Sequence, residues 1–473
     1  MTTVLETEPA TASETSPKRD AIIFIPGIGR QWNDQSLESM SNRIASAMDV
    51  KARTRQATFR SEVQFKKFGG DPKTKVCTIT RTNDREHLIV ADMYEYDYRE
   101  PLAKMFQDRS LFWRSFLTFM ALVRNFFSFG RMLLRGKSKR LSSRLQAFFT
   151  MLVFSLIFLY MFFLLLALLT TVVGVLRPSA LAGQPANQTA NAPQASQAPG
   201  AGPSTSPATR PARTRTERFK DVTIKTLLAV SGFLLWLGEL AQPWLLVFVA
   251  IGVFAPGDIK KRISDAAVDY LALLYYLDSG EGRNKIVGDL ERLLENLAES
   301  KEPAYQEIHI VAYSFGSMIA IDTLFPISGA PCGAVKNVGM LVTIGSPFDI
   351  VRAFLKNYFT EREGLEGHPR KWVNVFTPLD ALGSNFSNRG DDATKADVTV
   401  SLIKDKAVLF EPPKPVNFRY TLTPGENRSS FGSALFLWGL RSHSMYWEKD
   451  SEVAPSCFRD VVWEMYKDTS VLA

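Results

Sequence analysis

The sequence predicts an α/β fold, with a mostly parallel sheet and helices on both faces, interrupted by a two-helix transmembrane insertion. Two observations support this fold class. Short apolar runs of strand length alternate with longer stretches of helical periodicity towards both ends of the chain. Between these parts, residues 111–260 contain two apolar segments that are long enough to cross a bilayer. With 473 residues, of which 46% are hydrophobic, the chain can bury a large core.

The sheet is expected to come from two separate parts of the chain, residues 21–110 and 261–473. Residues 1–20 are polar and lack the apolar region of a signal peptide, so we expect a disordered tail. Apolar runs predict strands at 21–25, 76–80, 88–96, 308–311, 340–344, 372–376 and 418–422. Helical periodicity predicts helices at 35–48, 263–277 and 284–297, and a further helix directly after Ser314.

The middle of the chain is predicted to be a membrane module. Residues 148–176 form an uncharged apolar run that predicts a transmembrane helix. Residues 224–255 are also apolar and can span the bilayer if the helix tilts and kinks at Pro243; a re-entrant segment is the alternative. Residues 111–134 place polar side chains at helical spacing among aromatic ones. This pattern predicts an interfacial helix, with a core helix of the α/β domain as the alternative.

A connector at residues 177–220 joins the two apolar segments. It is dominated by Ala, Pro, Gln, Ser, Thr and Gly, and such a composition cannot bury enough apolar surface to fold. We therefore expect a flexible connector outside the bilayer. Because two crossings return the chain to its starting side, residues 21–110 and 261–473 can join in one sheet despite the insertion.

Basic residues predict how this module is oriented. The net charge is +8 and the isoelectric point is about 9.2, which would also suit a nucleic-acid-binding protein. The charges gather beside the apolar segments, however, so the expected partner is a lipid bilayer and not a nucleic acid. The flanking basic residues outnumber those of the connector, which by the positive-inside rule places both parts of the α/β domain in the cytosol, at a plasma or inner membrane. The flanking residues are Arg131, Arg135, Lys137, Lys139, Arg140, Arg144, Lys260, Lys261 and Arg262, and those near the connector are Arg177, Arg210, Arg213, Arg215, Arg218 and Lys220.

The spacing of the cysteines and the absence of known nucleotide-binding motifs exclude several kinds of site. Cys77, Cys332 and Cys457 have no paired spacing, so neither a disulfide framework nor a zinc site is predicted, which suits a reducing compartment. Neither a Walker motif nor a dinucleotide-binding fingerprint occurs. The sequence therefore predicts no cofactor and no metal.

The most informative segment surrounds Ser314. An apolar run at 308–311 is followed by a turn centred on this serine and then by an apolar stretch of helical character. Ala312 and Gly316, two positions before and after the serine, are small, as a sharp strand-to-helix turn requires. Such a turn lifts the serine hydroxyl above the sheet and points the N-terminus of the next helix at a developing oxyanion. The pattern predicts a nucleophilic serine.

A nucleophilic serine needs a base that is itself oriented by a carboxylate. Of the four histidines, His443 follows every predicted strand, whereas the other three lie in strands or in a loop, namely His87, His309 and His368. Asp380 ends a turn after the predicted strand 372–376 and is the expected acid; Asp349 also follows a predicted strand and is the alternative. Taken singly, a turn aspartate and a surface histidine explain these residues equally well. The order Ser, Asp, His favours catalysis.

With these residues in place, the chain resembles the α/β-hydrolase superfamily, and within it the lipase- and esterase-like serine hydrolases. The resemblance covers residues 20–110 and 260–450. It rests on the segments 22–29, 312–316, 345–347, 372–380 and 443–447. It implies an α/β-hydrolase-type sheet, a triad of Ser314, Asp380 and His443, and an oxyanion hole formed by the backbone N–H groups of Phe315 and Ile28.

Three residues depart from the family pattern. Pro26 stands where the family usually has histidine, Ala312 replaces the first glycine of the turn, and Tyr313 precedes the serine where histidine is common. None of them removes a member of the triad. The resemblance implies a serine hydrolase that cleaves a carboxylic ester. The predicted membrane module adds that the enzyme is membrane-anchored, and the tether and the interfacial helix favour an ester of a lipid or other acyl compound. A thioesterase or amidase on the same scaffold is one alternative, and a catalytically silent hydrolase fold that acts as a membrane interaction module is another.

Overall fold

The computed structural model of the chain describes two groups of segments on either side of a long central stretch. The described residues are 19–28, 37–52, 57–68, 71–83, 87–102, 272–278, 280–355, 357–378, 380, 382–387, 395–402, 411–420, 442–443, 446 and 457–472. All of them belong to one unit, built from residues 1–155 and 262–473.

The predicted membrane module lies outside the described residues. This concerns the interfacial helix at 111–134, the two crossings at 148–176 and 224–255, and the connector at 177–220. Residues 1–18 of the tail predicted at 1–20 also lie outside the described residues, whereas Arg19 and Asp20 begin β1, so the predicted tail is two residues too long. Among the residues that the structure does describe, no helix combines the length and apolar character needed to cross a membrane.

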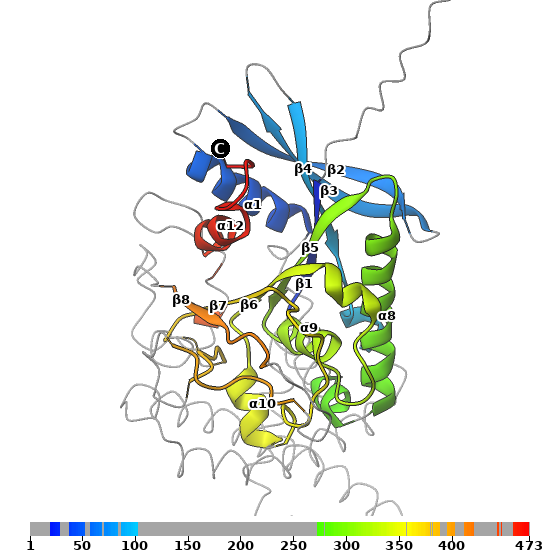
Figure 1. The fold of residues 1–473 in the computed structure, drawn as a ribbon, viewed down its shortest axis with the longest axis vertical. Coiled ribbons are helices and arrows are strands. Elements are labelled where there is room, and N and C mark those ends of the chain that lie inside the picture. The colour runs from blue at the N-terminus through cyan, green and yellow to red at the C-terminus, as the bar shows by residue number, and fades with distance from the viewer. Residues whose placement is uncertain are drawn as a thin grey trace, which may run out of the picture. The chain divides into compact units, whose positions relative to one another are not determined.

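The predicted α/β architecture with a mostly parallel sheet is confirmed. Eight strands form one mixed sheet in the order β2-β3-β4-β1-β5-β6-β7-β8 (Figure 1). In this order, each strand from β4 through β1 to β8 is parallel to the next one. The β2–β3 and β3–β4 pairs of this sheet are antiparallel. The strands are β1 (Arg19–Ile25), β2 (Thr58–Phe68), β3 (Asp71–Thr82), β4 (His87–Glu95), β5 (Tyr305–Tyr313), β6 (Val338–Ile344), β7 (Lys371–Phe376) and β8 (Val416–Arg419).

The pairing of β1 with β5 joins the two parts of the chain. Ile22 pairs with His309 and Ile25 pairs with Ala312, although residues 26–304 separate these strands in the sequence. Both strands are rich in aliphatic residues and are buried towards their carboxyl ends, as expected for parallel strands covered on both faces. The first part of the chain therefore supplies a strand directly beside the one that leads to Ser314.

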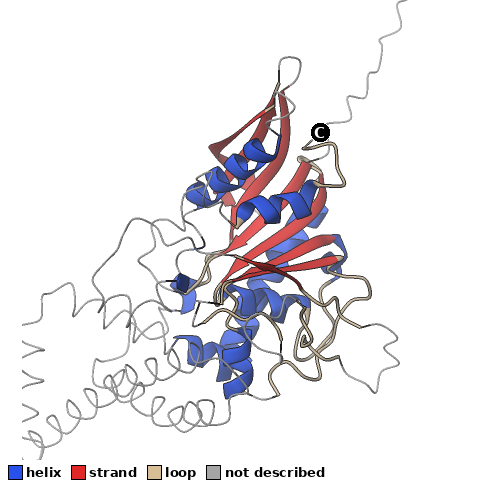
Figure 2. Cartoon of the chain, turned by 90° about the vertical axis from the view of Figure 1, so that its left-hand side faces the viewer, coloured by secondary structure: helices blue, strands red, loops and turns tan. Residues whose placement is uncertain are grey.

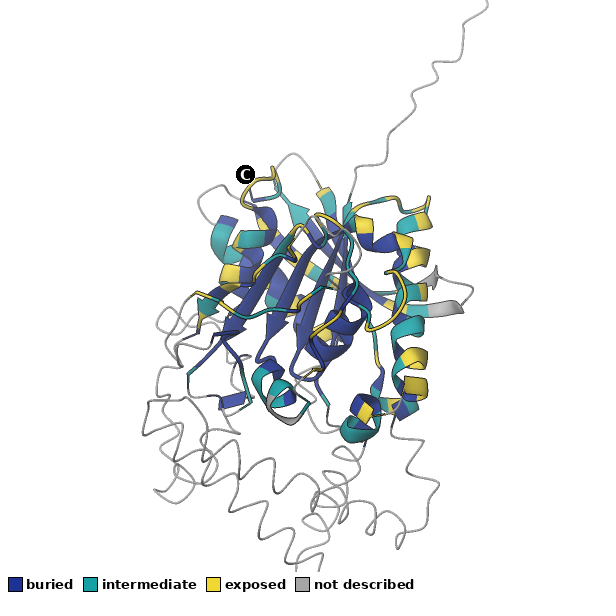
Figure 3. Ribbon diagram, turned by 60° about the horizontal axis from the view of Figure 1, so that its bottom comes forward, coloured by how far each residue is buried: buried dark blue, intermediate teal, exposed yellow. Residues whose placement is uncertain are grey.

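Helices cover both faces of the sheet (Figure 2). On one face, α1 (Leu37–Ala52) and α12 (Phe458–Tyr466) pack together in a cluster with Ile22, Phe24 and Val342. On the other face, α8 (Gly280–Glu299) and α9 (Gly316–Leu324) pack in a second cluster with Ile23 and Ile310. Figure 3 shows the central strands as a buried layer. Consecutive residues of one strand thus enter different cores, because strand side chains alternate between the two faces.

Most predicted elements appear with shifted ends. α1 and α8 correspond to the helices predicted at 35–48 and 284–297. Residues 272–278 are the described end of the helix predicted at 263–277. The strand predicted at 418–422 is β8, which ends at Arg419. The prediction omitted β2, α10 (Phe348–Phe354), the short 3₁₀ helix Gly333–Asn337 and α12.

β2 was missed because it is an edge strand with little apolar continuity. Polar residues at Arg60, Glu62 and Gln64 alternate with Val63 and Phe65, and the Phe65 side chain is 68% exposed. Residues 62–65 are exposed or half-buried on both faces of the sheet, so burial imposes no uninterrupted apolar run there. Its backbone pairing with β3, and not its composition, makes it a strand.

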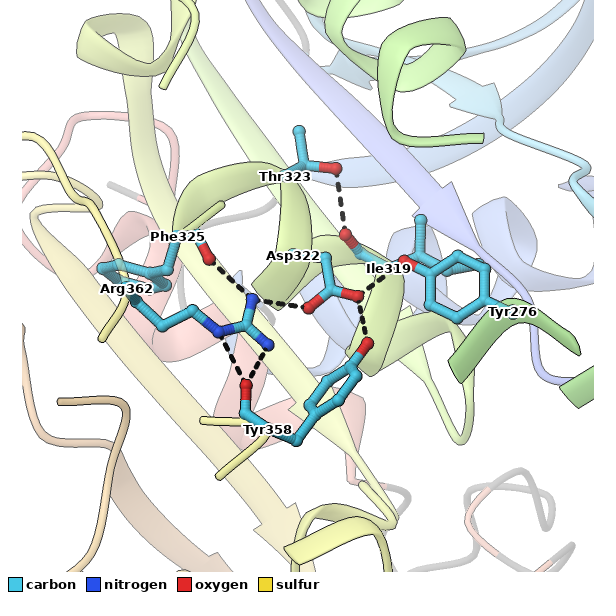
Figure 4. Close-up of polar contacts among 7 residues, drawn as sticks. All are labelled: Tyr276, Ile319, Asp322, Thr323, Phe325, Tyr358 and Arg362. Carbon is cyan, nitrogen blue, oxygen red and sulfur yellow. Dashed lines mark hydrogen bonds and ion pairs between the residues drawn. The ribbon is translucent and has the colours of Figure 1, made fainter. Parts of the chain in front are cut away.

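The helix that follows Ser314, α9, is buried on all sides and contains one aspartate. The Oδ1 atom of Asp322 forms an ion pair with Arg362 at 2.7 Å, and its Oδ2 accepts hydrogen bonds from the hydroxyls of Tyr276 and Tyr358 (Figure 4). Arg362 also donates to the carbonyls of Phe325 and Tyr358 at 2.8 Å. Burial, followed by the charge of Asp322, raises the pKa of both tyrosines well above the usual value, so both hydroxyls remain donors.

The ion pair and the tyrosine hydrogen bonds join three segments of the chain, one of which is α9. Tyr276 comes from the helix at 272–278, Asp322 from α9, and Arg362 from the loop before β7. Arg362 is fully buried, so removing its partner would leave an uncompensated charge in the core.

We predict that Asp322→Asn lowers the free energy of unfolding by about 3 kcal/mol or more, because it strands the buried guanidinium. The matched control is Asp289→Asn on α8, whose partner Arg292 has a side chain that is 74% exposed. An exposed pair contributes about 0–1 kcal/mol, so this variant should unfold close to wild type. Urea denaturation followed by tryptophan fluorescence compares the two. Equal losses in both variants would contradict a special role for the buried pair.

Candidate active site

The turn between β5 and α9 holds Ser314 in a conformation that few residues adopt. Its φ is 52°, in the left-handed region that costs energy for a residue with a side chain. Two backbone hydrogen bonds hold the turn: Ser314 N donates to the Ile344 carbonyl at 2.8 Å, and Ser317 N donates to the Ser314 carbonyl at 3.0 Å. A strained serine at a strand-to-helix junction is the geometry expected of a nucleophile elbow.

Small residues around the turn allow β1 to approach it closely. A Cβ atom at Gly316 would lie 2.5 Å from the carbonyl oxygen of Ile25 and 2.6 Å from that of Pro26. A Cβ atom at Gly27 would lie 2.9 Å from the Cβ of Ser314. The loop after β1 therefore passes directly over the serine. This loop continues to Ile28, the residue predicted to supply one of the two oxyanion donors.

Phe315, the other predicted oxyanion donor, stands at the N-cap of α9. The first N–H groups of a helix have no acceptor within the helix, so they are available to an anion at this end. Its ring is buried against two tyrosines, with centroids 6.3 Å from Tyr98 and 5.2 Å from Tyr276. The side chain thus anchors the backbone at the position where an oxyanion would be bound.

Ser314, His443 and Asp380 lie in one hydrogen-bonded chain. The Oγ atom of Ser314 is 2.7 Å from Nε2 of His443, and Nδ1 of His443 is 2.8 Å from Oδ2 of Asp380. All three are largely buried, with exposed fractions of 8%, 9% and 6% in the same order. Ser314 follows β5 and Asp380 follows β7, so both stand at the edge formed by the carboxyl ends of the parallel strands.

The carboxylate of Asp380 is oriented by donors on both oxygens. Oδ1 accepts the backbone N–H of Leu382 at 2.8 Å. Oδ2 accepts the hydroxyl of Tyr446 at 2.9 Å in addition to His443. A Cβ atom at Gly383 would lie 2.5 Å from Oδ2, so this position next to the carboxylate has no room for a side chain.

Tyr313, the residue before Ser314, contacts His443 in two ways. Its hydroxyl donates to the backbone carbonyl of His443 at 2.6 Å, and its ring stacks on the imidazole with centroids 5.1 Å apart and planes inclined by 25°. From the sequence, Tyr313 is only a departure from the family pattern. In the structure this tyrosine links the segment that carries His443 to the strand that leads to Ser314.

A buried polar network supports the loop that carries Asp380. Asn374 of β7 donates to the Ser384 carbonyl and to Oδ1 of Asn417, each at 2.9 Å. Thr343 of β6 donates to Oδ1 of Asn374 at 2.9 Å, and Trp372 donates to Thr343 at 3.1 Å. The network connects three neighbouring strands to the loop at 382–387, which explains polar residues in the middle of a buried sheet.

The alternative acid and the other histidines lie elsewhere. Asp349 accepts a hydrogen bond from the Ser384 hydroxyl and pairs with Arg352 at 3.2 Å. His309 lies beside Asp20 at 3.5 Å, and its ring contacts Tyr466 on the α12 face. His87 begins β4 and His368 precedes β7, at the amino ends of these strands and thus at the opposite edge from Ser314.

Among the described residues, no group of histidine, cysteine or acidic side chains could hold a metal ion. Cys77, Cys332 and Cys457 are free thiols. The candidate site thus consists of the three hydrogen-bonded side chains and the backbone around them. Sequence reasoning missed Tyr446, because nothing in the spacing of His443 and Tyr446 indicates that the phenol reaches Asp380.

No protein-family model matches this chain, and neither the curated proteins nor the solved structures include a significant match.

The close approach of β1 to the turn predicts the effect of a single methyl group. Gly316→Ala should lower the free energy of unfolding by about 1–3 kcal/mol, because its Cβ would overlap two backbone carbonyls. Gly288→Ala on α8 is the control: its Cβ meets nothing within 4 Å, and alanine in a helix is favoured by about 0.5–1 kcal/mol. Thermal unfolding should show shifts of opposite sign. A stable Gly316→Ala protein would mean that the turn is looser than described.

Proposed function

We propose that the protein is a membrane-anchored serine hydrolase that cleaves a carboxylic ester, with Ser314 as nucleophile, His443 as general base and Asp380 as the acid that orients it. The observation that carries this proposal is the hydrogen-bonded chain from Ser314 Oγ through His443 to Asp380, at 2.7 and 2.8 Å. A strained serine, a base within hydrogen-bond reach and a buried carboxylate behind the base are the parts that acyl transfer requires.

The geometry supports the following sequence of steps. Nε2 of His443 accepts the Ser314 hydroxyl proton while Oγ attacks the acyl carbon, and Asp380 stabilises the resulting imidazolium through Nδ1. The oxyanion is bound by the backbone N–H groups of Phe315 and Ile28. The imidazolium then gives its proton to the leaving alkoxide, which departs as an alcohol. A water molecule, deprotonated by His443, then attacks the acyl carbon. The bond between this carbon and Ser314 Oγ breaks, the imidazolium returns its proton to Oγ, and the carboxylic acid leaves.

Membership of the α/β-hydrolase superfamily is part of this proposal. Three features support it: the serine follows a central parallel strand, the acid follows a strand two places along the sheet, and the chain order is Ser, Asp, His. The loop after β1, which passes over the serine, corresponds to the loop that supplies the second oxyanion donor in that superfamily.

The membrane anchor and the substrate class rest on the sequence. Residues 148–176 and 224–255 have the length and apolar character of spanning helices, and the basic residues around them favour a cytosolic hydrolase domain. An even number of crossings agrees with the pairing of β1 and β5 in one sheet. Tethering to a bilayer suits an ester of a lipid or other acyl compound. Thioesters and amides react through the same steps, so a substrate panel distinguishes these three classes.

We predict that Ser314→Ala and His443→Ala each lower kcat for a short-chain ester by about a thousandfold or more, because each removes a group that takes part in the first step. Asp380→Asn should also cause a severe loss. Ser314→Ala should abolish labelling by a fluorophosphonate probe, which reacts only with an activated serine.

The matched control for the acid is Asp349→Asn, because Asp349 also follows a strand of the sheet and contacts Ser384 instead of His443. This variant should keep kcat within about threefold of wild type, as expected for a residue outside the reacting group. Near-wild-type turnover in Ser314→Ala would falsify the hydrolase proposal. A severe loss in Asp349→Asn with a mild one in Asp380→Asn would reverse the assignment of the acid.

The proposed topology predicts which positions are accessible from outside intact cells. A cysteine at Ser196 in the connector should react with an impermeant thiol reagent, whereas one at Lys301, an exposed residue of the described domain, should not. The background is suitable once Cys332 is replaced by serine, because Cys77 and Cys457 are buried. Equal labelling of both positions, or the reverse pattern, would contradict a cytosolic hydrolase domain.

A further inference from the structure

Tyr446 is a fully buried residue that shares a four-residue segment with the candidate base. Its ring stands edge-on to the His443 ring, with centroids 6.5 Å apart, and lies 5.9 Å from the ring of Tyr420. Its hydroxyl oxygen is 2.9 Å from Oδ2 of Asp380 and 3.0 Å from the backbone nitrogen of Thr377. The phenol thus lies between the acid and the end of β7.

The direction of the hydroxyl proton follows from these two contacts. The backbone N–H of Thr377 can only donate, so it points at a lone pair of the phenol oxygen. The single hydroxyl proton is then free to point at Asp380, whose carboxylate can only accept when ionised. Burial, followed by the charge of Asp380, raises the pKa of Tyr446 well above its usual value. The phenol therefore remains a neutral donor over the working range of a hydrolase.

The surroundings leave space for a phenol and little else. A Cβ atom at Gly345, whose φ is 56°, would lie 2.9 Å from Cε2 of Tyr446, and one at Gly383 would lie 3.1 Å from its hydroxyl. Two glycines, which follow the neighbouring strands β6 and β7, thus leave room for the ring and the hydroxyl. The same Gly345 Cβ would lie 3.1 Å from both Asp380 Oδ2 and Cε1 of His443, so tyrosine, acid and base share one closely packed space.

On the basis of the proposed function, we propose that Tyr446 is a positioning residue: its hydroxyl holds Oδ2 of Asp380 where the carboxylate accepts Nδ1–H of His443. Leu382 N–H holds Oδ1, so without the phenol Oδ2 is contacted by His443 alone, and the carboxylate can rotate together with the imidazole that it should orient. A poorly held carboxylate loses control of the tautomer and orientation of the base, on which proton transfer from Ser314 depends.

The arrangement also gives a physical reason why base and tyrosine lie in one short segment. His443 is held by Tyr313 through its backbone carbonyl, and Tyr446 is held by the backbone of Thr377. The segment 443–446 is therefore attached at one end to the nucleophile strand β5 and at the other to the acid strand β7. Relative placement of base and acid depends on these two hydrogen bonds.

The first test is Tyr446→Phe, which removes only the hydroxyl. Losing a hydrogen bond to a charged group should lower kcat by about ten- to a hundredfold, with KM within about twofold of wild type. The rate of fluorophosphonate labelling of Ser314 should fall in parallel. Expressing kcat per probe-reactive site removes any contribution from unfolded protein. The control is Tyr466→Phe on α12, which removes the hydroxyl of another fully buried tyrosine, one that contacts His309. It should leave kcat unchanged.

A double-mutant cycle with Asp380→Asn identifies the route by which Tyr446 acts. If the phenol works through the carboxylate, Tyr446→Phe should cause no further loss of kcat in the Asp380→Asn background. An equal loss in both backgrounds would overturn the assignment, and so would a wild-type kcat for Tyr446→Phe or a matching loss in Tyr466→Phe. Ser314→Ala is run alongside. If Ser314→Ala hydrolyses the ester as fast as wild type, the proposed hydrolase function is wrong, and the role assigned to Tyr446 is wrong with it. If activity depends on Ser314 but Tyr446→Phe has a wild-type kcat, only the role assigned to Tyr446 is wrong.

Discussion

The contact between the end of β1 and the turn at Ser314 is the constraint on which the rest of the site depends. Carbonyl oxygens of Ile25 and Pro26 lie so near Gly316 that no side chain fits between them. This contact requires β1 to lie beside β5, in a register that places Ile25 opposite Ala312. A strand from the first part of the chain thus determines how closely the loop with Ile28 approaches the serine. The strain at Ser314 persists because the surrounding backbone holds the turn in place.

The three candidate catalytic side chains come from segments that are far apart in the sequence, and polar contacts between those segments set their distances. Tyr313 joins the nucleophile strand to the backbone of His443, Tyr446 joins the base segment to Asp380, and Asn374 joins β7 to the acid loop. Each of these groups is buried, so an unmade hydrogen bond would carry the full cost of desolvation. The same contacts that satisfy buried polar groups therefore position the reacting atoms.

A second buried polar cluster surrounds Asp322 of α9. Asp322 and Arg362 neutralise each other, and Tyr276 connects them to Phe315 through its ring. Tyr98 and Tyr276 pack on Phe315 from segments at the two ends of the stretch 103–271. The backbone next to the nucleophile is thus packed between the chain that leads into this stretch and the chain that leaves it. Buried aromatic contacts fix such a backbone more firmly than solvent-exposed turns could.

Local chemistry determined much of the site from the sequence alone. A tight strand-to-helix turn requires small residues on either side of the serine, and fully covered parallel strands require continuous apolar runs, so Ser314 and the central strands could be recognised from short segments. β2 and α10 could not, because their formation depends on the strands and loops they pack against. Sequence order favoured Asp380 over Asp349 only weakly, since both follow strands of the sheet. In the tertiary structure Asp380 contacts His443, whereas Asp349 contacts Ser384. Tertiary structure alone brought Tyr446 to the acid and Arg362 to Asp322, because contacts between segments distant in the sequence arise from chain packing and leave no periodic pattern in the chain.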